Sequence, residues 1–176
     1  MPKYDFEYTD GIVALGKRGS GKTSVVKAIA NKVPNKVIVD IVGNLESLKD
    51  NSARYYLTSP INSVAVFDKI NYKKGNFYLV LDEADRIPYK NALQEIINLG
   101  RNWNIGYIAT ARRTANIHKD YLANATHIIA FRHNLPQDLD MLNEWLPPEA
   151  VAQITKLGEH EFVLVSNDKF IGVYRL

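Results

Sequence analysis

The residues best suited to chemistry lie in a glycine-rich segment, Gly16-Lys-Arg-Gly-Ser-Gly-Lys-Thr23. The segment matches the pattern GxxxxGK[ST] at every fixed position. Glycines let main-chain amides approach phosphate oxygens without a β-carbon in the way, and a following helix directs its positive end at the same anion. Lys22 would bring a positive charge to the β- and γ-phosphates, and the Thr23 hydroxyl would ligate Mg²⁺. The spacing predicts a site for ATP and Mg²⁺.

The whole of this loop and the first turn after it are expected to contact the nucleotide. The expected contact residues are Gly16, Lys17, Arg18, Gly19, Ser20, Gly21, Lys22, Thr23 and Ser24. The side chains of Lys17 and Arg18 are expected to be solvated, with Arg18 available to a neighbouring subunit.

Two adjacent carboxylates, Asp82 and Glu83, follow the apolar run Asn76-Phe-Tyr-Leu-Val-Leu81. Ligands collect at the carboxyl ends of parallel strands, so both acids should lie beside the phosphate loop. Asp82 would hold Mg²⁺, and Glu83 would orient and deprotonate the water that attacks the γ-phosphate. A second carboxylate at this point favours hydrolysis over phosphoryl transfer to a metabolite. Asp85 is expected to be a helix cap or a surface charge.

Short apolar strands alternate with amphipathic helices along the chain. Strands are predicted at 11–15, 36–42, 55–57, 76–81, 105–110 and 127–131, and a terminal hairpin is predicted from 161–165 and 170–174. Helices are predicted at 21–33, 59–70 and 89–103, with two short helices around Pro147 and Pro148. This alternation predicts an α/β fold: a three-layer P-loop NTPase of the RecA/ASCE-like type, with a mostly parallel central sheet flanked by helices and a C-terminal β-hairpin.

The composition narrows the class of protein. The 176 residues fit one domain, 1–176, and 46% of them are hydrophobic while 23% are charged, as in soluble globular proteins. The absence of cysteine excludes disulfides and thiolate-bound zinc. No apolar run reaches the roughly 20 residues of a membrane span, and the polar segment Met1–Asp10 does not look like a secretory signal. A cytoplasmic location is expected.

The motifs together resemble the FtsK/HerA superfamily of DNA-pumping ATPases, especially its compact HerA-like and viral genome-packaging members. Gly16–Thr23 is similar to the HerA phosphate loop, and Asp40 before Gly43 resembles the family's Asp-Pro-x-Gly turn, with Ile41 in place of proline. Leu81–Asp85 resembles its acidic strand, and Gly100–Thr110 resembles the Gly-Arg segment that leads into a strand ending Ala-Thr-Gln-Arg-Pro. The resemblance runs from about Gly11 to Val165.

The resemblance also implies roles for residues outside the phosphate loop. Where the family has a glutamine that senses the γ-phosphate, this chain has Ala111, so the role would pass to Thr110 or Arg112 or the sensor works differently. Members form rings in which a neighbour supplies an arginine finger; Arg101 occupies the Gly-Arg position and is the first candidate, with Arg112, Arg113 and Arg132 in reserve. Basic clusters at 72–74 and 32–36 are candidate DNA-contacting loops.

The resemblance implies a motor that pumps double-stranded DNA, and the small size favours packaging of a viral genome into a preformed capsid. Its partners would be double-stranded DNA, further copies of the chain in a pentameric or hexameric ring, and capsid or portal vertex proteins; a viral chain would act in the host cytoplasm. A cellular HerA-like or conjugation-type pump is the close alternative. An isolated helicase core domain, a small-molecule kinase and a nucleotide-gated assembly protein are the others.

Overall fold

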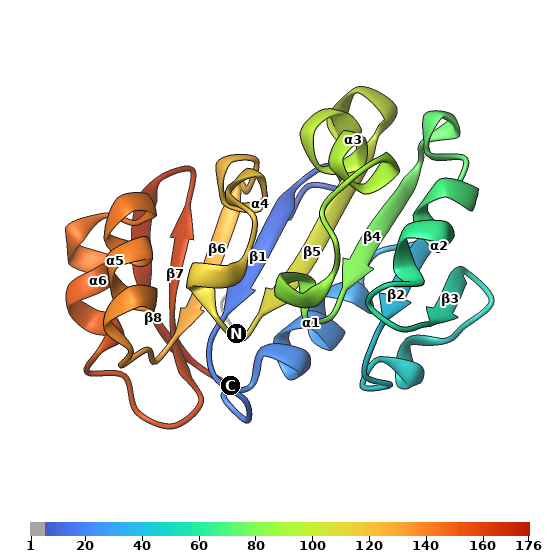
Figure 1. Ribbon diagram of the computed structural model, residues 1–176. Helices are drawn as coiled ribbons and strands as arrows, with labels where there is room; N and C mark the ends of the chain where they lie inside the picture. The colour runs from blue at the N-terminus through green and yellow to red at the C-terminus, as the bar shows by residue number, and fades with distance from the viewer. Residues whose placement is uncertain (1–5) are drawn as a thin grey trace.

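The computed structural model describes residues 6–176, so residues 1–5 of the polar segment Met1–Asp10 lie outside the described part. Its centre is an eight-stranded sheet with the order β3-β2-β4-β5-β1-β6-β7-β8 (Figure 1). The strands are β1 (Gly11–Leu15), β2 (Lys36–Asp40), β3 (Ala53–Leu57), β4 (Phe77–Leu81), β5 (Ile105–Ala111), β6 (His127–Phe131), β7 (Glu161–Ser166) and β8 (Lys169–Arg175). Pairing is parallel from β3 to β6 and antiparallel from β6 to β8. The predicted fold class, with its C-terminal hairpin, is confirmed.

Helices cover both faces of the sheet. They are α1 (Lys22–Ala30), α2 (Ser63–Lys69), α3 (Ala92–Leu99), α4 (Lys119–Ala123), α5 (Pro136–Trp145) and α6 (Pro148–Ile154). Figure 1 shows α2, α3 and α4 on one face and α1 on the other. Two apolar clusters reflect this division, because one contains the inner residues of α1 and the other contains those of α2 to α6. The result is three layers.

The central strands bring their carboxyl ends to one edge of the sheet, which we call the carboxyl edge. Strand β5 lies between β1 and β4, with Leu15 in register with Ala111 and Leu81 in register with Ala109. Strands β1, β4 and β5 are buried along their whole length, as expected for parallel strands covered on both faces. The loops that follow these strands therefore meet at a single place.

Several boundaries differ from the predicted ones for local reasons. Strand β2 ends at Asp40 rather than residue 42, because the Asp40 carboxylate accepts main-chain amides of the following turn. Helix α3 begins at Ala92 rather than residue 89, because Asn91 has a φ of 53° and leaves the helical region. Beyond Leu99 that helix continues as a 3₁₀ turn, Gly100–Trp103. Helix α2 begins at Ser63 instead of residue 59. Helix α4 was not predicted, since five residues show no periodicity.

Candidate nucleotide-binding site

The glycine-rich loop joins β1 to α1 at the carboxyl edge. Gly19 and Gly21 have φ angles of 79° and 110°, which favour glycine, and Gly21 is the last residue before α1. No side chain caps α1, so the amides of its first turn remain directed at the loop. Lys17 and Arg18 are exposed, as predicted. This strand, loop and helix form the arrangement that binds phosphate at a helix N-terminus.

Lys22 is buried beneath this loop, with 7% of its surface exposed. Its Nζ donates hydrogen bonds to the main-chain oxygen of Gly16 and, at 2.9 Å, to that of Lys17. Burial lowers the pKa of Lys22 to about 8; the charge of Asp82 acts in the opposite direction and that of Arg112 in the same direction. An anion beside the amine would restore its positive charge.

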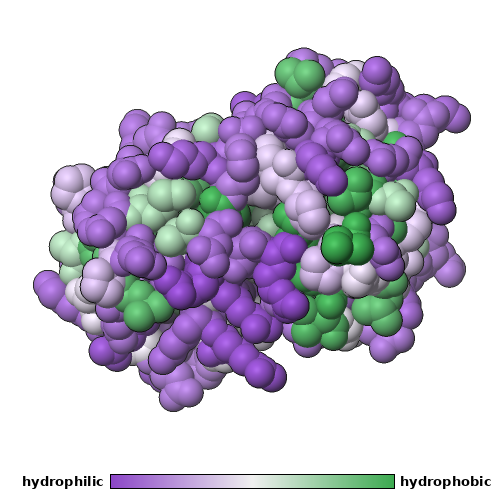
Figure 2. Space-filling model, viewed as in Figure 1, coloured by the Kyte–Doolittle hydropathy of each residue, from purple (hydrophilic) through white to green (hydrophobic). Residues whose placement is uncertain are grey.

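The paired acids lie where the sequence predicts them. Asp82 and Glu83 follow β4 and are 2% and 3% exposed. They line one hollow of about 260 Å³ with Lys22 and Thr23. The other lining residues are Arg18, Gly19, Lys27, Val42, Asn44 and Arg112. In Figure 2, strongly hydrophilic side chains gather over the carboxyl ends of the central strands. The loop, the lysine and both acids therefore share one site.

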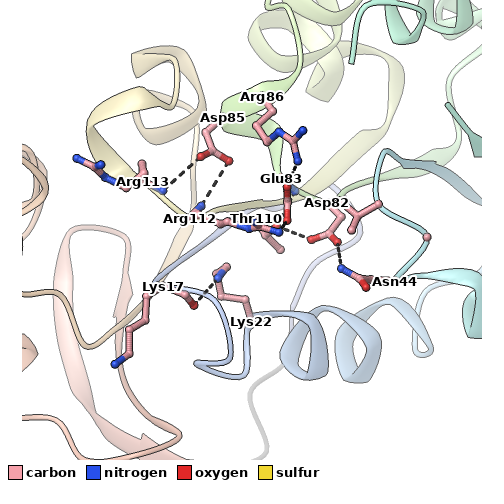
Figure 3. Close-up of polar contacts among 12 residues, drawn as sticks. Lys17, Lys22, Asn44, Asp82, Glu83, Asp85, Arg86, Thr110, Arg112 and Arg113 are labelled. Atoms are coloured by element: carbon pink, nitrogen blue, oxygen red, sulfur yellow. Dashed lines mark hydrogen bonds and ion pairs between the residues drawn. The ribbon is translucent and has the colours of Figure 1, made fainter. Parts of the chain in front are cut away.

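Asp82 is held by two neutral donors. The Thr110 hydroxyl donates to its Oδ1 at 2.7 Å, and the Asn44 side-chain amide donates to its Oδ2 at 3.1 Å (Figure 3). Each donor uses only one lone pair of a carboxylate oxygen, so acceptor capacity remains on both oxygens. Thr23 and Asp82 offer the hydroxyl and carboxylate oxygens that Mg²⁺ takes together with phosphate and water. Among residues 6–176 there is no gathering of three or more His, Asp or Glu side chains that would form an all-protein metal site.

Glu83 stands in an unusual backbone conformation and carries two ion pairs. Its φ is 54°, and its main-chain N–H donates to the Thr110 hydroxyl at 2.8 Å. Its carboxylate accepts from Arg86 at 2.7 Å and is paired with Arg112 as well (Figure 3). Positive φ is rare in residues other than glycine and asparagine, so a glutamate here has to be held by its surroundings.

Thr110 is fully buried and lies between the two acids. Its single hydroxyl hydrogen goes to Asp82, so it has none left for a phosphate oxygen in this arrangement. Its predicted sensor role stays a prediction, and would act through the two acids. The neighbouring Ala111 is also buried.

Asp85 is neither a helix cap nor a simple surface charge, contrary to expectation. Its carboxylate accepts the main-chain N–H groups of Arg112 and Arg113 at 3.4 and 3.3 Å. Burial raises the pKa of Asp85, although these two hydrogen bonds act in the opposite direction. Asp85 therefore anchors the loop that follows β5.

Sequence reasoning missed Asn44 and Arg86, and gave no structural reason for Asp40. The fully buried Asp40 carboxylate accepts main-chain N–H groups of Val42, Gly43 and Leu45 at 3.0, 2.7 and 2.7 Å, and the Tyr55 hydroxyl at 2.9 Å. Burial alone would raise the pKa of Asp40, but these hydrogen bonds outweigh it and lower the pKa. These hydrogen bonds fix the turn after β2, and this turn places the Asn44 side chain beside Asp82. An aspartate closing a strand before a glycine was the available signal.

Arg101 lies at the opposite edge of the sheet from the phosphate loop, just before β5. It is 65% exposed on its side chain and donates to the Thr126 hydroxyl at 2.9 Å, with Asp10 3.9 Å away. Of the reserve arginines, Arg112 lines the site, whereas Arg113 pairs with Asp138 at 3.0 Å. Arg101 is thus remote from its own phosphate loop, and its role as a finger stays a prediction.

No helix among residues 6–176 is long and apolar enough to cross a membrane. Comparison with curated protein sequences gives no match.

Comparison with solved structures finds P-loop ATPases. The genome packaging NTPase B204 of Sulfolobus turreted icosahedral virus 2, in complex with AMPPCP, is 20% identical with a TM-score of 0.74 over 97% of this chain and 98% of that chain. Thermomonospora curvata EccC (ATPases 2 and 3) is 15% identical with a TM-score of 0.71, covering 93% of this chain and 36% of that chain. The pCW3 conjugation coupling protein TcpA is 12% identical with a TM-score of 0.63, covering 96% and 60%.

The fold-level resemblance to compact packaging ATPases that the sequence predicts is confirmed by these structures. Residues 12–132 match the family described as "ATPase family associated with various cellular activities (AAA)". That match includes the phosphate loop and both acids of the site, and it spans more than half of the 176 residues. The chain belongs to this AAA family of P-loop ATPases.

Proposed function

We propose that the chain is an ATP-hydrolysing DNA translocase that pumps a viral double-stranded DNA genome into a preformed capsid. The observation that carries this proposal is the extent of the structural likeness to B204, 97% of this chain and 98% of that one. The secretion ATPase EccC matches over only 36% of its own chain. The likeness to B204 therefore extends over nearly the whole of both chains, whereas the likeness to EccC is confined to about a third of that chain.

The proposed chemistry uses one P-loop ATPase domain, 1–176. The loop amides and Lys22 would hold the β- and γ-phosphates, and Thr23 and Asp82 would hold Mg²⁺, which would supply positive charge to the phosphates. Glu83 orients and deprotonates the attacking water. Buried side chains that converge on one hollow support these roles, because a water-poor site strengthens each electrostatic contact.

The proposed partners are double-stranded DNA, further copies of the chain and capsid or portal vertex proteins, in the host cytoplasm. The predicted DNA-contacting loops need one correction, because Lys36 is buried and paired with Asp50 at 2.7 Å. Lys32, Lys73 and Lys74 are exposed. Their loops adjoin through a hydrogen bond between the Asn35 side chain and the Asn76 main-chain oxygen. Repeated around a ring, three lysines per subunit would supply enough charge to contact DNA phosphates.

A ring would also explain how Arg101, which is remote from the phosphate loop of its own subunit, could act on a nucleotide. Because Arg101 and the phosphate loop lie at opposite edges of the sheet, Arg101 would reach a nucleotide only on a neighbouring copy. We propose a pentameric or hexameric ring in which Arg101 enters the neighbour's site.

The experiment that tests the proposed function is ATP turnover by the purified chain with and without double-stranded DNA, over a series of salt concentrations. A motor predicts stimulation by DNA that weakens as salt rises, since contacts to phosphates release counterions. A triple variant, Lys32→Gln, Lys73→Gln and Lys74→Gln, should keep basal turnover and lose stimulation. Turnover that is indifferent to DNA at every salt concentration would rule out a translocase.

The likeness to TcpA, over 96% of this chain, keeps a conjugation-type DNA pump as the second candidate. Both pumps would respond to DNA. Co-sedimentation with empty capsids carrying a portal vertex distinguishes them, because only a packaging motor has to bind such particles.

A further inference from the structure

Arg112 lines the same hollow as Glu83, Lys22 and Thr23. Its guanidinium is ion-paired with the carboxylate of Glu83 (Figure 3). A triphosphate bound by Lys22 and Thr23 would lie in this hollow. The Arg112 side chain is 34% exposed, so it is not enclosed by its present partner. Its charge is close enough to Lys22 to contribute to the lowered pKa of that amine.

The second arginine on Glu83 approaches from a different direction. Arg86 donates to Oε2 of Glu83, whereas Arg112 pairs with Oε1. Arg86 is half exposed and is not among the residues that line the hollow. Each oxygen of the Glu83 carboxylate is thus engaged by a guanidinium group, which leaves fewer lone pairs free to accept a hydrogen bond from a water molecule. Of the two arginines, only Arg112 has a competing partner within the site.

The backbone that carries Arg112 is anchored on both sides. Asp85 accepts the main-chain N–H of Arg112 and of Arg113, and Asp138 of α5 accepts the Arg113 side chain and the Ala115 N–H, both at 3.0 Å. Asp138 is buried. The long Arg112 side chain can therefore change partner while its main chain stays in place.

We propose that Arg112 exchanges between Glu83 and the γ-phosphate, so that a single residue detects the γ-phosphate and releases the catalytic base. This inference rests on the proposed ATPase site and assigns the sensor role left open by Ala111. ADP has no γ-phosphate and leaves Arg112 on Glu83. ATP draws Arg112 away and leaves Glu83 with Arg86 alone, which is when water has to be activated.

The exchange has a consequence for binding that does not depend on turnover. A ligand shifts such an equilibrium only by its differential affinity for the two arrangements, so ATP has to overcome the Glu83–Arg112 ion pair. Removing the charge of Glu83 should therefore tighten binding of an ATP analogue and leave ADP binding unchanged. The gain should require Arg112 and should not require Arg86.

The test is equilibrium binding of AMPPCP and of ADP, with Mg²⁺, by calorimetry. We expect Glu83→Gln to bind AMPPCP about tenfold more tightly than the parent, from the loss of one charge-assisted hydrogen bond, with ADP affinity unchanged. In an Arg112→Ala background, the same Glu83→Gln change should give no gain. In an Arg86→Ala background it should give the full gain, which makes Arg86 the matched control. Arg112→Gln replaces Arg112→Ala if the alanine variant does not fold by circular dichroism.

Three results would overturn the exchange: no gain in Glu83→Gln, an equal gain for ADP, or a gain that persists without Arg112. Lys22→Ala separates this failure from failure of the ATP site. If Lys22→Ala loses AMPPCP binding but the affinity gain of Glu83→Gln does not depend on Arg112, the ATP site is supported and the proposed exchange of Arg112 is wrong. If Lys22→Ala binds AMPPCP as tightly as the parent does, the proposed ATP site is wrong.

Discussion

The hydroxyl of Thr110 donates to Oδ1 of Asp82 at 2.7 Å, across the gap between the ends of β5 and β4. The hydroxyl oxygen of Thr110 also accepts the main-chain N–H of Glu83 at 2.8 Å. One buried side chain thus fixes the candidate metal ligand and the backbone of the candidate base together. Thr110 is best understood as a residue that positions both acids.

Replacement of Thr110 by valine tests this positioning. Thr110→Val keeps the side-chain volume but leaves the Glu83 N–H without its acceptor, so we expect Mg²⁺-dependent ATP turnover to fall about tenfold to a hundredfold, as for other residues that orient metal ligands. Thr110→Ser restores the hydroxyl and should recover most of the activity. Steady-state turnover over a Mg²⁺ titration is the measurement. A valine variant with the parent's Mg²⁺ dependence and turnover would show that the contact has no functional effect.

The lowered pKa of Lys22 predicts how nucleotide affinity depends on pH. Burial lowers this pKa to about 8, so the amine loses its proton as the pH rises through 8. Bound phosphate favours the charged amine, and binding above pH 8 therefore requires uptake of a proton. We expect the affinity for AMPPCP to decline above pH 8 by up to about tenfold per pH unit. Calorimetric titrations with AMPPCP from pH 7 to pH 9.5 measure this decline in affinity, since that pH range spans the pKa of Lys22.

The control is Lys22→Arg, because arginine keeps its charge throughout this range. If the variant binds, its affinity should be independent of pH. An affinity of the parent that is equally flat would contradict the assigned role of the Lys22 charge.

The positions of the candidate site residues could be predicted because they follow local rules. The spacing of Gly16–Thr23 specifies a turn into a helix, and the end of an apolar strand specifies where Asp82 and Glu83 lie in a parallel sheet. Neither step required knowledge of distant contacts. The strand boundaries near the site are correct to within two residues for the same reason.

The partners of the acids could not be predicted, because they come from segments without a local pattern. Asn44 reaches Asp82 only through the turn that Asp40 holds, and that turn depends on a Tyr55 hydroxyl contributed by β3. The pairing of Glu83 with Arg112 depends on the adjacency of β4 and β5, which the sequence does not reveal. The burial of Lys36 against Asp50, which removes one lysine from the predicted basic loop, likewise could not be seen in the sequence.

Mixing of variants tests whether the chain forms a ring in which Arg101 enters the nucleotide site of the neighbouring subunit. Arg101→Ala should lower turnover by about 10³-fold or more if Arg101 is a finger supplied in trans. Adding Lys22→Ala, which lacks phosphate binding but keeps Arg101, should partly restore turnover at the intact loops of the Arg101→Ala subunits. The measurement is turnover at fixed total protein and varied ratio.

The matched control is a mixture of Lys22→Ala with Glu83→Gln. Both variants damage a subunit's own site, so no ratio should give rescue. If the mixture of Arg101→Ala with Lys22→Ala also stays inactive at every ratio, the proposal that two subunits share one nucleotide site is wrong.

The most direct test of the proposed ATPase site compares nucleotide binding with hydrolysis in Lys22→Ala and Glu83→Gln. We expect Lys22→Ala to lose AMPPCP binding, and Glu83→Gln to keep this binding and lose turnover by about 10²- to 10⁴-fold, the usual contribution of a general base. Full ATP turnover in Glu83→Gln, or parental AMPPCP affinity in Lys22→Ala, would contradict a hydrolytic site built from these two residues.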